Sequence, residues 1–124
     1  MPVTIYHNPR CTKSRQTLAL LESQGIKPDV IEYLVTPPTE AELKRLLKLL
    51  GIPPRELLRT KEAEYKQEKL DRPDVTDAEI IQAMVKHPRL IERPIVVSGD
   101  KAALGRPPEN VLKIIHASAR LSGR

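Results

Sequence analysis

The 124-residue chain has a single cysteine, Cys11. One cysteine excludes an internal disulfide, so any redox cycle at this thiol must take its second sulfur from another molecule. The chain also lacks the several Cys and His ligands in paired spacing that a zinc site requires. Its three histidines are scattered, and we expect His87 and His116 to be surface or packed residues. The sequence therefore predicts no metal site.

Aromatic residues are also scarce, with three tyrosines and no tryptophan or phenylalanine. A hydrophobic content of 40% is still enough for a core, which must be built from Leu, Ile, Val and Ala. No apolar run approaches the roughly 18 residues that a transmembrane helix needs. The N-terminus lacks the layout of a secretion signal. We expect a monomeric, cytoplasmic protein without membrane contact.

The formal net charge of +5 at pH 7 points to anionic partners. A nucleic-acid-binding domain gathers its basic residues on one face. Here both signs are mixed along the chain, and no aromatic residues interleave with the basic ones. We therefore expect no nucleic acid partner.

Strand and helix patterns alternate at the two ends of the chain. Residues 3–7, VTIYH, predict a strand, which an Asn-Pro turn and a helical pattern up to Gly25 follow. Residues 29–34, DVIEYL, predict a second strand, parallel to the first. Residues 93–105 predict a β-hairpin around a Ser-Gly-Asp turn, and residues 107–121 predict a final amphipathic helix.

Two capping boxes mark helices in the middle of the chain. Thr39 and Glu42 form the first, and Gly51 is a C-terminal stop for that helix. Thr76 and Glu79 form the second, which opens a helix of about ten residues.

The remaining middle segments have weaker patterns. Residues 53–59, PPRELLR, are consistent with a short helical turn, and the polar residues 60–75 predict a mobile, partly helical surface segment. Without the helical block at about 36–92, the chain has the α/β topology of the thioredoxin fold: a parallel βαβ unit, an antiparallel hairpin and a C-terminal helix. We predict one such domain over residues 1–124, with the block as an insertion.

Cys11 lies where the first strand gives way to the first helix. The free N–H groups and the positive dipole end of a helix stabilise an anion there. The nearby cations Arg10, Lys13 and Arg15 would act in the same direction. Such surroundings lower the pKa of a cysteine and favour the reactive thiolate, whereas an inert buried cysteine has apolar neighbours.

Two further polar residues accompany this cysteine. His7 could add a positive charge or a hydrogen bond, and the hydroxyl of Ser14, one helical turn away, could donate to the sulfur or to a bound oxyanion. The interval from Cys11 to the next arginine is Cys-x3-Arg, which excludes the Cys-x5-Arg loop of tyrosine-phosphatase-like proteins. The sequence thus favours a nucleophilic thiolate near anion-binding groups.

The segments YHNPRCTKSRQTLALLE, EYLVTPPTEAELKRLL, LLRTKEAEY, HPRLIERPIVV and GRPPENVL resemble the thioredoxin-fold, glutaredoxin-linked arsenate reductase family. They match in order over nearly the whole chain. Thr12 and Lys13 depart from the glycine-containing pair common after the cysteine. The resemblance implies that Cys11 is the nucleophile and that His7 and Ser14 tune its thiolate.

The resemblance also implies that Arg59, Arg93 and Arg106 hold the oxyanion. Chemically this is reasonable, because the planar fork of arginine binds pairs of oxygens and stays charged. Pro94 stands where the thioredoxin fold carries a cis-proline beside the reactive thiol. We therefore predict that the Arg93–Pro94 bond is cis.

The resemblance implies that arsenate is reduced to arsenite with glutathione as co-substrate, glutaredoxin as protein partner and no bound cofactor. Two alternatives stay open. Redox-sensing transcription regulators of the family bind RNA polymerase and typically carry Cys-x-x-Cys, whereas position 14 here is serine. A glutathione-dependent thiol oxidoreductase would need Cys11 but not the three arginines.

Overall fold

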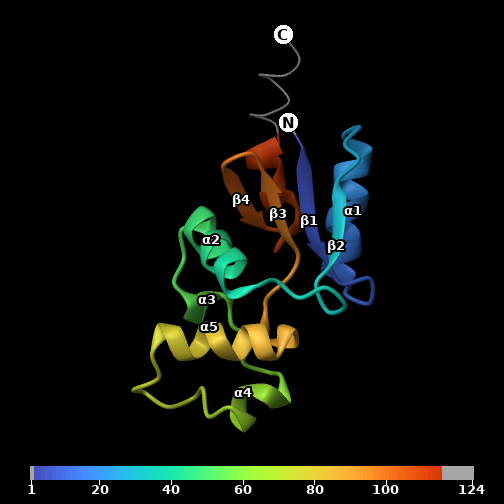
Figure 1. The fold of residues 1–124 in the computed structure, drawn as a ribbon. Coiled ribbons are helices and arrows are strands. Elements are labelled where there is room, and N and C mark those ends of the chain that lie inside the picture. The colour runs from blue at the N-terminus through green and yellow to red at the C-terminus, as the bar shows by residue number, and fades with distance from the viewer. Residues whose placement is uncertain (1, 116–124) are drawn as a thin grey trace. The chain divides into compact units, whose positions relative to one another are not determined.

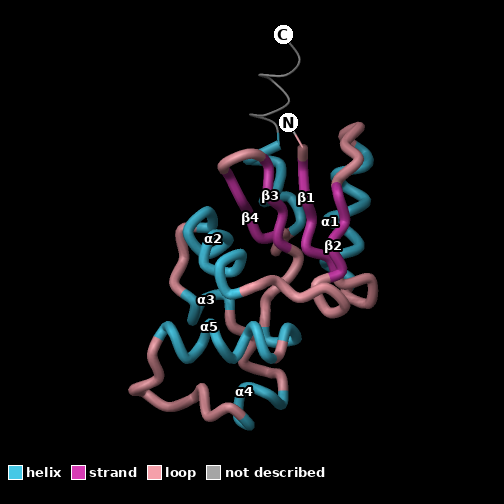
Figure 2. Tube along the Cα trace, viewed as in Figure 1, coloured by secondary structure: helices cyan, strands magenta, loops and turns pink. Residues whose placement is uncertain are grey.

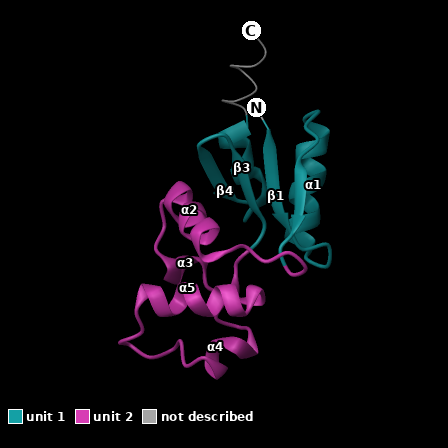
Figure 3. Ribbon diagram, viewed as in Figure 1, with its two compact units in different colours: residues 1–33, 93–124 teal, residues 34–92 magenta. Residues whose placement is uncertain are grey.

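A computed structural model describes residues 2–115 of the chain. They form one four-stranded sheet and several short helices (Figure 1). The chain divides into two compact units (Figure 3). We call residues 1–33 with 93–124 the sheet unit and residues 34–92 the helical unit. That the two belong to a single domain stays a prediction.

The sheet unit has the predicted thioredoxin-like topology (Figure 2). Its strands are β1 (Val3–His7), β2 (Asp29–Glu32), β3 (Ile95–Ser98) and β4 (Lys101–Leu104), in the order β2-β1-β3-β4. β1 pairs in parallel with β2 and antiparallel with β3, and β3 and β4 form the hairpin. The predicted second strand was too long. It stops at Glu32 because its partner there, His7, is the last residue of β1.

Helix α1 (Thr12–Ser23) connects β1 to β2. The final predicted helix begins with a 3-10 turn, η2 (Pro108–Val111), which packs against α1. The core between them contains the buried residues Val3, Ile5, Leu21, Val96, Val111, Ile114 and Ile115. Residues 112–115 continue as helix, and the remainder of the predicted segment, with His116, lies outside the described residues.

The helical unit contains α2 (Glu40–Leu50), α3 (Pro54–Leu57), α4 (Ala63–Gln67), α5 (Asp77–Lys86) and the 3-10 turn η1 (Pro88–Leu90). Both capping boxes are confirmed, one at the start of α2 and the other at the start of α5. Gly51 ends α2 with a φ of 69°. The segment 60–75 contains α4, which agrees with the predicted partial helix. It was predicted to lie on the surface, but it also buries Leu70 and Val75. Within residues 2–115, no helix combines the length and the apolar character needed to span a membrane.

Candidate active site

Cys11 is the N-cap residue of α1, with extended backbone angles of φ −94° and ψ 124°. Its N–H donates to the carbonyl of Asn8 at 3.0 Å, and its own carbonyl accepts from the N–H of Arg15 at 3.0 Å. The Asn8 side chain accepts from the N–H of Arg10 at 3.0 Å, which closes the turn between β1 and α1. The thiol is therefore at the strand–helix junction, as predicted.

The pKa of the Cys11 thiol is shifted below its usual value. Burial acts to raise this pKa, but several donors to the thiolate outweigh it. They are the backbone N–H of Ser14, the guanidinium of Arg93 and the backbone N–H of Lys13. The helix N-terminus and one distant arginine thus stabilise the thiolate together.

The cations nearest in sequence contribute less than predicted. Arg10, Lys13 and Arg15 were expected to act through their side-chain charges, but the main side-chain cation on the sulfur is Arg93. Arg15 instead braces the turn: its Nη1 donates to the Pro9 carbonyl at 2.9 Å. Nearness in the sequence was a poor guide, because Arg10 in the turn and Lys13 and Arg15 on α1 are exposed side chains.

The side chains of Ser14 and His7 form a buried pair. Ser14 Oγ lies 2.6 Å from His7 Nδ1 and accepts from the N–H of Asn8 at 3.0 Å. Ser14 is fully buried and His7 is 6% exposed. Ser14 donates to the Cys11 sulfur through its backbone N–H, and its hydroxyl lies against His7 Nδ1 and the N–H of Asn8. A role of the hydroxyl toward a bound oxyanion stays a prediction.

The pKa of His7 lies below its usual value. Burial lowers it, the charge of Glu32 opposes that effect, and the charge of Arg15 adds to the lowering. This shift favours the neutral imidazole over the protonated form. Of the two roles considered for His7, the structure supports the hydrogen bond to Ser14 and not a positive charge.

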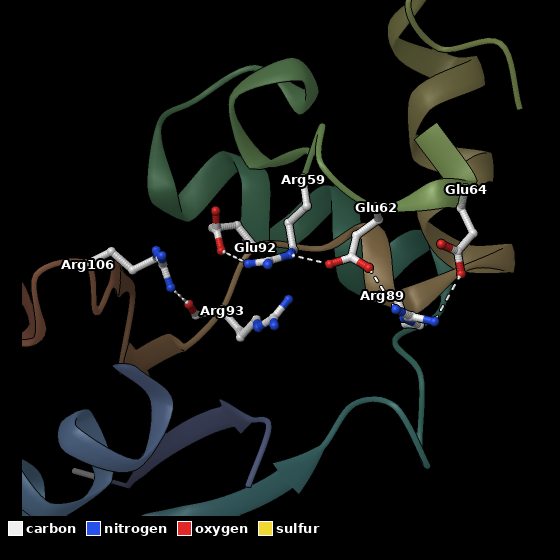
Figure 4. Close-up of polar contacts among 7 residues, drawn as sticks. All are labelled: Arg59, Glu62, Glu64, Arg89, Glu92, Arg93 and Arg106. Atoms are coloured by element: carbon white, nitrogen blue, oxygen red, sulfur yellow. Dashed lines mark hydrogen bonds and ion pairs between the residues drawn. The ribbon is translucent and has the colours of Figure 1, made fainter. Parts of the chain in front are cut away.

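Two of the three predicted oxyanion ligands, Arg93 and Arg106, lie in neighbouring loops of the sheet unit. Arg106 donates from Nη1 to the backbone carbonyl of Arg93 at 3.4 Å (Figure 4), and Arg93 in turn reaches Cys11. The Arg93–Pro94 bond is cis, as predicted. The Arg106–Pro107 bond is also cis, which the sequence did not indicate.

Gly105 and Thr17 link these loops to α1, and neither was singled out from the sequence. The N–H of Gly105 donates to the Pro94 carbonyl at 2.9 Å, and Thr17 Oγ1 lies 3.4 Å from the Gly105 carbonyl. A Cβ at position 105 would overlap the Thr17 side chain and approach Pro94 Cγ to 2.7 Å. The loop that carries Arg106 can therefore pack against α1 only with glycine at this position. In the sequence, the available sign of this close contact was a glycine directly before an Arg-Pro pair.

Replacing Gly105 with alanine should destabilise the protein by about 1–3 kcal/mol, the usual cost of overpacking a close contact. Urea unfolding measures this change. Gly51→Ala is the comparison, because its Cβ would meet no atom within 4 Å and only its φ of 69° opposes the change. That variant should lose about 1 kcal/mol. A Gly105→Ala protein as stable as the wild type would contradict the close packing.

The lowered pKa of Cys11 predicts how its alkylation rate depends on pH. The thiolate is the species that reacts with iodoacetamide, so the alkylation rate should rise with pH and level off above the pKa. We expect the midpoint of this profile to lie below that of the same thiol in urea-unfolded chain. Mass spectrometry of the alkylated protein measures both. Equal midpoints would show that Ser14 and Arg93 do not stabilise the thiolate.

Arg59, the third predicted oxyanion ligand, belongs to the helical unit. Its guanidinium pairs there with Glu62 and Glu92. His87 is half-buried, with Nε2 3.2 Å from Glu68 Oε2, which agrees with a packed residue. Among residues 2–115, no group of three His, Cys, Asp or Glu side chains is arranged to hold a metal ion.

Comparison with known proteins gives consistent matches. The model of the ArsC family matches residues 6–114. An arsenate reductase of Haemophilus influenzae is 52% identical over 116 residues, which are 93% of this chain and 100% of that protein. The Escherichia coli protein YfgD, named uncharacterized, is 54% identical over 91% of this chain and 96% of its own length. The solved structure of an arsenate reductase from Vibrio cholerae has a TM-score of 0.89 at 55% identity, covering 92% of this chain and 98% of that one.

Proposed function

The chain belongs to the ArsC family, and from this we propose that it reduces arsenate to arsenite in the cytoplasm, with glutathione as reductant and glutaredoxin as partner. The observation that carries the proposal is the convergence of the Ser14 and Lys13 N–H groups and the Arg93 guanidinium on Cys11. This arrangement provides both a nucleophile and donors for a tetrahedral anion at one place.

In the first step, the Cys11 thiolate attacks the arsenic atom. A sulfur–arsenic bond forms and one oxygen leaves as water after protonation. Arginine side chains neutralise the remaining oxygens and orient the arsenic toward the sulfur. Arg93 and Arg106 are the candidates in the sheet unit, and Arg59 is the candidate in the helical unit.

In the second step, glutathione attacks Cys11 of the adduct. A disulfide forms between the two sulfurs, and the electron pair of the broken sulfur–arsenic bond stays on arsenic, which is thereby reduced to arsenite. Glutaredoxin then removes the glutathione by thiol exchange and regenerates the Cys11 thiol. The single cysteine of the chain agrees with this scheme, because both further thiols come from outside.

The proposal is tested by following NADPH oxidation with arsenate, glutathione, glutaredoxin and glutathione reductase. We expect turnover that requires arsenate and that stops when glutathione or glutaredoxin is omitted. Turnover with protein–glutathione mixed disulfides but not with arsenate would instead indicate the thiol oxidoreductase alternative. Capture of RNA polymerase by a protein without either activity would indicate the regulator.

A further inference from the structure

Thr17 is a buried polar residue of α1 that the proposed reaction does not use. The residue is 0% exposed. Its Oγ1 donates to the carbonyl of Lys13 at 2.8 Å, one turn earlier in the helix, and lies 3.4 Å from the carbonyl of Gly105. A hydroxyl has one proton, so the shorter contact, to Lys13, is the main hydrogen bond of this side chain.

The carbonyl that Thr17 binds belongs to the peptide unit that also carries the N–H of Ser14. Among the groups that lower the pKa of Cys11, this N–H has the largest effect. The planar, conjugated amide joins the two contacts into one chain, which runs from the Thr17 hydroxyl through the amide to the Cys11 sulfur. Hydrogen bonds in such a chain polarise and strengthen one another. The Thr17 hydroxyl therefore acts on the sulfur without touching it.

The Thr17 side chain is fixed from its other side by the loop at Gly105. A Cβ at position 105 would lie only 3.0 Å from Thr17 Cγ2, so the Gly105 backbone packs directly against this side chain. The N–H of Gly105 donates to the Pro94 carbonyl at 2.9 Å, which connects the contact to the loop that carries Arg93. A β-branched side chain in a helix also has few allowed χ1 rotamers. The hydroxyl is therefore held toward the Lys13 carbonyl.

We propose that Thr17 is a positioning residue for Cys11, and that its hydroxyl orients and polarises the Lys13–Ser14 peptide so that the Ser14 N–H stabilises the thiolate. The inference deepens the proposed function and rests on it only in that this thiolate is the nucleophile toward arsenate. The shared amide on which it depends involves no substrate. A threonine that served packing alone would contribute to stability and leave the sulfur unaffected.

The test compares two variants that each remove a different half of the side chain. Thr17→Val replaces the hydroxyl with a methyl group of similar shape, and Thr17→Ser keeps the hydroxyl and removes the methyl group. In Thr17→Val we expect the pH midpoint of Cys11 alkylation by iodoacetamide to rise. The rate below the midpoint should fall about 1.5-fold to fourfold, because a hydrogen bond to a charged acceptor loses about 10–30% of its strength without its neighbour in the chain. Thr17→Ser should keep the wild-type profile.

Ser23→Ala is the matched control. Ser23 Oγ donates to the Leu20 carbonyl at 2.7 Å, so it is also a hydroxyl bonded to a carbonyl of α1, but at the opposite end of the helix from Cys11. Its removal should leave the alkylation profile unchanged. The other charged or titratable groups of the site are the same in every variant: His7, Arg10, Lys13, Arg15 and Arg93.

Three results with folded proteins would overturn the inference. They are an unchanged profile in Thr17→Val, a shift of equal size in Thr17→Ser, and a shift of equal size in Ser23→Ala. NMR of the wild type gives the answer if Thr17→Val does not fold. We expect a Thr17 hydroxyl proton that exchanges slowly with water and whose chemical shift follows the titration of Cys11. A hydroxyl proton in fast exchange, or one that does not follow this titration, would overturn the inference.

The alkylation profile requires no arsenate, which separates this inference from the proposed reaction. A shifted profile in Thr17→Val of a protein without arsenate turnover would reject the proposed reaction and keep the inference. An unshifted profile in Thr17→Val of a protein that reduces arsenate would overturn the inference alone.

Discussion

Replacing Cys11 with serine should abolish arsenate-dependent NADPH oxidation. A hydroxyl at this position keeps the shape of the side chain and can still accept the N–H groups of Ser14 and Lys13. Its pKa is far too high for the helix N-terminus and one arginine to ionise it at pH 7, and it cannot form the disulfide with glutathione. Both steps of the proposed reaction therefore fail together.

The comparison variant for this experiment is Thr12→Ser, which changes the next residue by one methyl group and leaves the thiol in place. Thr12 is the first residue of α1 and is exposed. Its turnover should remain within severalfold of the wild type. Arsenate-dependent turnover in a Cys11→Ser protein free of wild type would show that another group is the nucleophile.

Replacing Arg93 with alanine should lower kcat/KM for arsenate by about 10²- to 10³-fold, the usual cost of one donor to a developing oxyanion. Arg93 has two tasks in this site. It donates to the Cys11 thiolate, and under the proposed function its fork also holds the oxyanion at that sulfur. The alkylation profile of Cys11 should therefore move to higher pH in the same variant, because the neighbouring positive charge is lost.

Two companion variants separate charge from geometry. Arg93→Lys keeps the charge without the planar fork, so it should restore much of the Cys11 pKa but only part of the arsenate turnover. Arg10→Ala removes a cation close to Cys11 in sequence, and its effect on both readouts should be small, because Arg10 contributes its backbone to the turn. Equal losses in Arg10→Ala and Arg93→Ala would show that the effect is only one of net charge.

Several elements of the fold followed directly from short sequence patterns. The two capping boxes and Gly51 were located correctly because each depends on residues no more than four positions apart. The length of β2 was predicted wrongly, because a strand ends where its partner ends, and that partner lies in another part of the chain. The burial of Leu70 and Val75 within a polar segment was missed for the same reason: it depends on what packs against them.

The candidate site divides in a similar way. The position of Cys11 at a strand–helix junction and the Ser14–His7 pair involve residues within one βα turn, so their proximity could be expected. The burial of this pair and the hydrogen bond from the N–H of Asn8 to Ser14 could not be expected, because both depend on the tertiary structure. Arg93 was expected only through the resemblance to a family, because nothing local to Cys11 points to it.

The sequence by itself determined that one thiol stands at the start of a helix, that it has no internal partner for a disulfide, and where the main strands and capped helices begin. The tertiary structure decided which charges act. It placed Arg93 at the sulfur, left Arg15 to brace a turn and paired Arg59 with Glu92, 33 residues away. The physical reason is that capping and periodicity depend on neighbours along the chain. The pKa of a thiol and the ion-pair partners of an arginine depend on every group within a few ångströms in space, wherever that group lies in the sequence.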